Sequence, residues 1–144
     1  MKTAVLIVRI LFGALLIFSS LNFFFNFMPM EMPEGEAQKF FIGMSASVYM
    51  FPLIKIIELV VGLVLISGYY IPLASIVIFP ISLNIFLFHL FLAPAGLGMS
   101  VFVLGANLFL AYYYRRHYKT IFETGKSNEP KERQANLKMQ EELK

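Results

Sequence analysis

Four long apolar stretches constrain this chain more than any other feature of its sequence. A transmembrane helix needs about 20 mainly apolar residues, because a helix rises about 1.5 Å per residue across a hydrocarbon core about 30 Å thick. The connections SGYYIP and APAGLG are so short that the helices flanking each of them must run antiparallel. We therefore predict an all-α integral membrane bundle of four transmembrane helices within residues 1–118. The helices are expected at about 4–24, 47–68, 71–93 and 98–116.

The composition supports a membrane protein over a soluble one. Of the 144 residues, 58% are hydrophobic and 15% are charged, whereas a soluble domain has about 45–50% apolar and about 25% charged residues. A soluble chain of this length could not bury so much apolar surface, so the lipid bilayer must cover much of it. The chain has no cysteine, which excludes disulfides, thiolate metal sites and iron–sulfur clusters.

The first apolar stretch follows Lys2, as the apolar core of a secretory signal peptide would. However, Arg9 interrupts its core, and Phe18 stands two places before Ser20, where a cleavage site needs a small residue. We predict that this stretch is retained as a helix.

The positions of the basic residues predict the orientation of the bundle. Cytoplasmic ends of transmembrane helices carry an excess of Lys and Arg, and with an even number of helices both ends of the bundle lie on one side. Both termini are therefore expected in the cytoplasm, with the Glu-rich segment after the first helix outside. The basic residues that mark the two ends of the bundle are Lys2, Arg9, Arg115, Arg116, Lys119 and Lys126.

Two segments lie outside the four helices. Residues 37–44 fit either a short interfacial helix, with its Phe side in the headgroups, or a plain loop. Residues 119–144 are polar and mixed in charge, and an isolated helix of this length is marginal in water. We expect a partly disordered cytoplasmic tail there rather than a docking helix.

Six polar residues interrupt the apolar stretches and form the candidate site. At 100° per residue, each helix has a stripe of polar or small residues that we expect to face the bundle interior, and Lys55 and Asn84 are expected near mid-membrane. The six residues of this predicted polar core are Arg9, Lys55, Glu58, Asn84, His89 and Asn107. Ionisable residues at this depth are costly and often mark functional sites. They also fix helix register by pairing, and Asn84 and Asn107 would then only hydrogen-bond neighbouring helices.

Glu58 is expected to be the hub of this core, and two pairings are open to it. Lys55 lies three residues away on the same helix face. Arg9 could instead reach Glu58 across a helix interface, where Gly13 and Gly62 would allow close approach.

The sequence resembles the DoxX-like family of small bacterial membrane proteins over roughly residues 5–118. The matching pieces are VRILFGALLIF, KIIELVVGLVLISGYYIPLA and FPISLNIFLFHLFLAP. This resemblance implies a four-helix bundle in the bacterial inner membrane, and it implies a role as a subunit or partner of redox systems, some of them quinone-linked. The family's first helix often ends in a Gly-x-x-Lys pattern, where this chain has SSLNFF, so no role of that Lys can be carried over.

The leading hypothesis is an accessory or anchor subunit of a membrane redox system, bound to an oxidoreductase subunit and with quinone as its candidate cofactor. A quinone site needs apolar walls and hydrogen-bond donors, for which His89, Asn84 and Lys55 are candidates. The alternatives are a small transporter, which would have to be a homo-oligomer to enclose a pathway, and a non-catalytic stabiliser of other membrane proteins.

Other chemistry is poorly supported by the sequence. His89 and His117 are expected toward opposite membrane faces, which argues against bis-His haem ligation. No nucleophile–base pair, metal-ligand cluster or nucleotide-binding motif is recognisable, so a self-contained enzyme is the least supported class. No nucleic-acid partner is expected, because the basic residues form a membrane edge.

Overall fold

The computed structural model describes residues 2–29, 32–118 and 139–140. The chain divides into two compact units, Met1–Tyr114 and Arg115–Lys144. The first unit contains the helix bundle. The expected polar tail of residues 119–144 lies outside the described residues, apart from residues 139 and 140.

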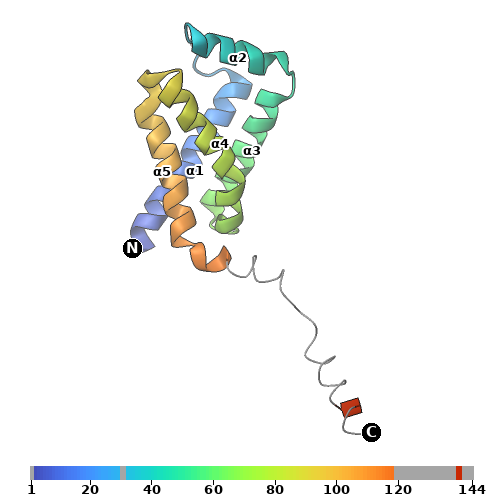
Figure 1. Ribbon diagram of the computed structural model, residues 1–144. Coiled ribbons are helices and arrows are strands. Elements are labelled where there is room, and N and C mark those ends of the chain that lie inside the picture. Colours follow the sequence, from blue (N-terminus) through green and yellow to red (C-terminus); the bar gives the residue numbers. More distant parts are fainter. Residues whose placement is uncertain (1, 30–31, 119–138, 141–144) are drawn as a thin grey trace. The chain divides into compact units, whose positions relative to one another are not determined.

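Four helices of the first unit are long and apolar enough to cross a membrane. They run up and down in chain order (Figure 1), and the described residues contain no strand. The prediction of an all-α bundle with four transmembrane helices is therefore confirmed. The helices are α1 (Lys2–Phe25), α3 (Met50–Ser67), α4 (Ile71–Phe91) and α5 (Leu97–Tyr113), the last preceded by the 3₁₀ helix η1 (Pro94–Gly96).

The hairpin between α3 and α4 depends on two residues in the left-handed region. Gly68 ends α3 with φ of 85°, a conformation that glycine adopts without steric cost. Tyr70, with φ of 54°, precedes α4. Pro72 lies in the first turn of α4, where its missing N–H removes no helical hydrogen bond. The chain therefore reverses over three residues, as the SGYYIP sequence predicts.

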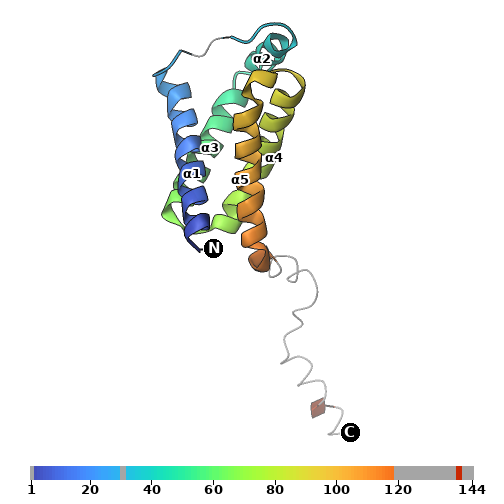
Figure 2. The ribbon, with the colours of Figure 1, turned by 90° about the vertical axis from the view of Figure 1, so that its left-hand side faces the viewer.

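The segment that fits either a helix or a loop in the sequence is a helix, α2 (Glu36–Ala46). It lies across the end of the bundle where α1 ends and α3 begins (Figures 1 and 2). Phe40 and Phe41 fix it there: the Phe40 ring lies 5.2 Å from that of Phe88 on α4, and the Phe41 ring lies 5.5 Å from that of Phe51 on α3. The aromatic side of α2 thus covers one end of the core.

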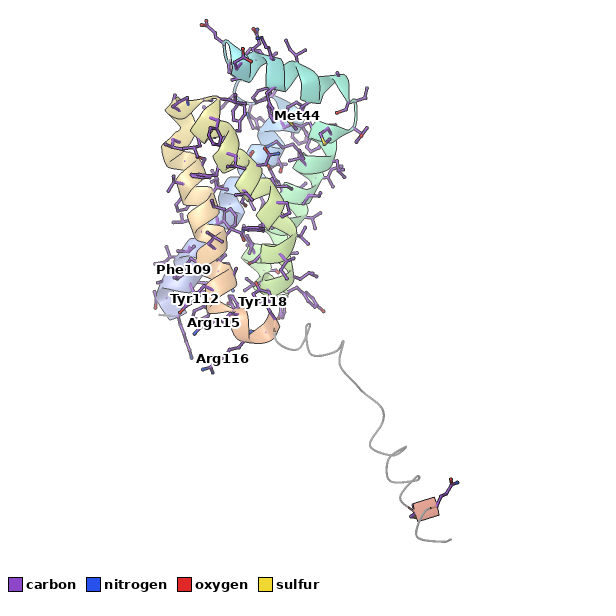
Figure 3. The ribbon with its side chains drawn as sticks, viewed as in Figure 1. Met44, Phe109, Tyr112, Arg115, Arg116 and Tyr118 are labelled. Atoms are coloured by element: carbon purple, nitrogen blue, oxygen red, sulfur yellow. The ribbon has the colours of Figure 1, made fainter. Side chains whose placement is uncertain are left out.

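Within the bundle, α1 packs mainly on α3 and α4 mainly on α5, while contacts of α3 with α4 and of α1 with α5 join the two pairs. Each of these four helices buries one large apolar side chain almost completely: Phe12, Leu65, Ile78 and Leu110. Figure 3 shows Met44 at the end covered by α2, and Phe109 and Tyr112 near the opposite end of α5. The N-terminus of α1 also lies at that opposite end, so α1 begins and α5 ends on the same side.

Candidate functional site

The interface between α1 and α3 is built on two glycines. A Cβ atom at Gly62 would lie 2.8 Å from the carbonyl oxygen of Gly13, and one at Gly13 would lie 3.0 Å from the carbonyl oxygen of Gly62. Both helix backbones therefore approach more closely than any side chain would allow. This confirms that Gly13 and Gly62 permit close approach, and it brings the polar groups on these two helices within hydrogen-bond reach.

Glu58 pairs with Lys55, one turn earlier on α3. The Lys55 Nζ lies 2.7 Å from Glu58 Oε2, and the side chains are 16% and 2% exposed, respectively. In the described part of the chain, no ion pair joins Glu58 to Arg9. Of the two pairings open in the sequence, the structure contains the one along the helix.

Two serines of α1 join this pair. Lys55 Nζ donates a second hydrogen bond to Ser19 Oγ at 2.8 Å. Ser20 Oγ donates to the backbone carbonyl of Lys55, also at 2.8 Å. We call Ser19, Ser20, Lys55 and Glu58 the Lys55–Glu58 network. It has no formal net charge, and it ties α1 to α3 through both a side chain and a backbone atom. Lys55 makes more of these contacts than Glu58, the expected hub.

The network lies closer to the α2 end of the bundle than the expected mid-membrane level of Lys55. The helix α3 begins at Met50, three residues later than predicted, because Ser47, Val48 and Tyr49 form the turn from α2. Lys55 is therefore only about 8 Å along the axis from the start of α3. At this depth the ammonium group is nearer the headgroup region, which lowers the cost of its charge.

Arg9 lies beside the other end of α3 and is only partly buried. A Cβ atom at Gly68 would lie 2.7 Å from Arg9 Nη1, so the guanidinium packs directly against this glycine. The last carbonyl groups of a helix carry partial negative charge, and a cation beside them is stabilising. Arg9 thus interacts with the α3 terminus, at the end of the bundle opposite α2.

Asn107 of α5 is fully buried, as predicted for the polar core. In the part of the chain that the structure describes, neither polar atom of its amide has a hydrogen-bond partner. The same holds for Ser75 Oγ on α4 and for Arg9 Nε on α1. Ser82, by contrast, donates to the Ile78 carbonyl of its own helix at 3.1 Å.

The placement of Asn84 in the polar core is wrong, because Asn84 is exposed on the outside of α4. Ser75 and Ser82 of the same helix are buried. Asn84 follows Ser82 by two residues and therefore lies about 200° around the helix from it. The two side chains cannot face the same way, and the serines occupy the interior.

His89 closes the turn between α4 and η1. Its Nδ1 donates to the Ala93 carbonyl at 3.0 Å, which fixes the ring orientation. The ring also packs on Gly96, where an added Cβ atom would overlap His89 Cε1. The structure therefore separates the six predicted residues: Lys55 and Glu58 meet, while Arg9, Asn84, His89 and Asn107 lie in four other surroundings.

Comparison with known protein families matches residues 4–90, more than half of the chain, to DoxX. The chain belongs to the DoxX family. The matched segment runs from α1 to the last turn of α4, and so contains the whole Lys55–Glu58 network. No curated protein and no solved structure matches the chain. With four helices able to span a membrane, this DoxX protein is a multi-pass membrane protein.

A quinone, the cofactor that the family resemblance implies, does not fit the arrangement of donors in this DoxX bundle. Asn84 faces outward, Lys55 is bound to Glu58 and Ser19, and the Nδ1 of His89 is bound to Ala93. An open groove of about 440 Å³ lies between α1 and α5 and offers apolar walls. None of these three donors lines it. Its lining residues are Leu11, Leu15, Gly98, Met99 and Phe102.

The packing of His89 on Gly96 gives a prediction for this DoxX protein. Gly96→Ala should lower the free energy of unfolding by about 1 kcal/mol, because the new methyl group displaces the imidazole and weakens its bond to Ala93. His89→Ala should remove most of this cost, since the space of the ring is then free. Thermal unfolding of the two single variants and the double variant measures the coupling. If the two losses simply add, the ring does not hold this turn.

Proposed function

We propose that this DoxX protein is an accessory or anchor subunit of a membrane redox system in the bacterial inner membrane, with both termini in the cytoplasm. It would hold an oxidoreductase subunit in the bilayer without carrying out the chemistry itself. One observation carries this proposal: the ion pair that the structure describes inside the bundle is used for joining helices. Lys55 and Glu58, both on α3, neutralise each other, and Ser19 of α1 accepts a second hydrogen bond from the ammonium group.

The network's surroundings favour an accessory role over transport. A transported ion or solute needs polar groups that it can reach, whereas Glu58 is buried against its own partner. The groove between α1 and α5 is apolar and suits lipid chains or another helix better than a solute. The redox part of the proposal rests on the family resemblance.

The test is purification of the tagged protein from its native host in a mild detergent, with mass spectrometry of the proteins that accompany it. We expect an oxidoreductase subunit in stoichiometric amount, and we expect that deleting the DoxX gene lowers the electron flux of that enzyme into the quinone pool. Re-expression of the wild-type chain, or of a lipid-facing control variant such as Leu63→Ala, should restore the flux.

Two results would count against this function. One is a protein that purifies alone, together with unchanged quinone-linked respiration after deletion. The other is solute flux in vesicles containing only this protein that disappears with Glu58→Gln, which would favour a transporter.

A further inference from the structure

Asn84 places a polar amide on the lipid-facing surface of the bundle. It lies seven residues before the end of α4, which is about 10 Å along the helix axis and inside the hydrocarbon region. The side chain is exposed, and no hydrogen bond within the described residues involves it. Lipid tails offer no hydrogen-bond partner, so an amide at this depth favours contact with another helix.

Asn84 is the one polar member of a regular outer stripe on α4. The members are spaced alternately by four and three residues, the repeat with which two helices pack side by side over several turns. All of them are exposed. They are Leu73, Val77, Pro80, Asn84, Leu87 and Phe91. A single Asn among apolar residues at such positions is a known determinant of register and partner number in paired helices.

A second polar group lies about two turns before Asn84 on α4. Pro80, inside the helix, has no N–H to donate to the carbonyl of Ile76, so that carbonyl lacks its usual helical partner. The hydroxyl of Ser82 does not replace this bond, because its Oγ donates to the carbonyl of Ile78. In membrane proteins such freed backbone groups are usually covered by a neighbouring helix.

We propose that the Leu73–Phe91 stripe of α4 pairs with the same stripe of a second copy of this chain, and that the two Asn84 amides hydrogen-bond to each other. Chemistry and symmetry both favour a second copy of this chain as the partner of the stripe. Two copies inserted with the same topology have their Asn84 residues at the same depth, on opposite sides of a two-fold axis along the membrane normal. A carboxamide has both donors and an acceptor, so it is complementary to its own symmetry mate. This inference does not depend on the redox role.

The chain contains no cysteine, so single introduced cysteines report the pairing directly. In vesicles containing only this protein, Leu87→Cys should form disulfide-linked dimers under mild oxidation, because Leu87 lies on the stripe next to Asn84. Phe18→Cys is the matched control: Phe18 is also exposed, but it lies on α1, which packs on α3 and α5. It should cross-link far less.

The role of the amide is tested by measuring the dimer dissociation constant from energy transfer between labelled copies in vesicles. Asn84→Leu should weaken the dimer roughly three- to tenfold, as expected for the loss of two interhelical hydrogen bonds in a membrane. Asn84→Gln, which keeps the amide, should lose less. Folding is checked by helical circular dichroism, and we expect no change, because Asn84 has no hydrogen bond within the described bundle.

Three results would overturn the proposal: monomers at all protein densities, equal cross-linking at Leu87→Cys and Phe18→Cys, or an Asn84→Leu dimer as tight as the wild type. The first of these results would mean that the partner of Asn84 is a different membrane protein. Since all measurements use the purified chain, they can fail while the redox function stands, and the reverse is also true.

Discussion

Glu58→Leu should lower the free energy of unfolding by about 3–5 kcal/mol, the loss typical of removing one partner from a buried ion pair. The carboxylate is 2% exposed and lies 2.7 Å from Lys55 Nζ. Without it, the Lys55 ammonium keeps its bond to Ser19 but has no counter-charge in an apolar surrounding. Unfolding of the purified protein in mixed micelles of increasing denaturing detergent measures the loss. In the native host, Glu58→Leu should also impair complementation more than any lipid-facing substitution.

The double variant Lys55→Met, Glu58→Leu separates the pair from the rest of the core. An ion pair replaced on both sides by apolar residues of similar size often costs little, because the desolvation penalty of both charges disappears as well. We therefore expect the double variant to be more stable than Glu58→Leu alone. Leu63→Ala, on the lipid-facing side of the same helix, serves as the control and should have a small effect. Additive losses from Lys55→Met and Glu58→Leu would contradict a coupled pair.

The four membrane helices could be predicted because the bilayer imposes one length and one composition on all of them. Their ends were harder to predict, as α3 illustrates. By sequence alone, residues 47–49 could belong to the first turn of α3, but they form the turn that connects α2 to α3. The aromatic contacts of Phe40 and Phe41 with α4 and α3 are long-range. These contacts hold the helix of residues 36–46 against the bundle, whereas the local sequence alone fits either a helix or a loop.

The candidate site could be predicted in part for the same reason. Lys55 and Glu58 share a helix face by spacing alone, so their pairing needs no knowledge of the neighbours. That Glu58 does not pair with Arg9 cannot be predicted without the neighbouring helix, because Arg9 contacts Gly68 only when α1 and α3 lie side by side. The participation of Ser19 depends on that same register. The outward position of Asn84 follows from the sequence as well, since its angle from the buried Ser82 separates the two residues on α4.

Gly62→Ala should lower the free energy of unfolding by about 1–3 kcal/mol, the range for overpacking a tight interface. The added Cβ would lie 2.7 Å from Ile17 Cγ1 and 2.8 Å from the Gly13 carbonyl oxygen. The side chain of Ile17 can move, but the backbone of α1 can yield only if the two helices separate. This loss exceeds the gain of about 1 kcal/mol that alanine usually brings to a helix interior. The variant is measured in the same detergent titration as Glu58→Leu.

Gly105→Ala is the matched control for Gly62→Ala. Gly105 lies within α5, and a Cβ atom there would meet no atom within 4 Å, so the substitution should be neutral or stabilising by up to about 1 kcal/mol. Separation of α1 from α3 must also stretch the 2.8 Å bond from Ser20 to the Lys55 carbonyl. The losses of stability from Gly62→Ala and Ser20→Ala should therefore be less than additive in the double variant, because Gly62→Ala already weakens the hydrogen bond that Ser20→Ala removes. Full additivity, or equal effects of Gly62→Ala and Gly105→Ala, would mean that close approach of the helices does not hold the Lys55–Glu58 network together.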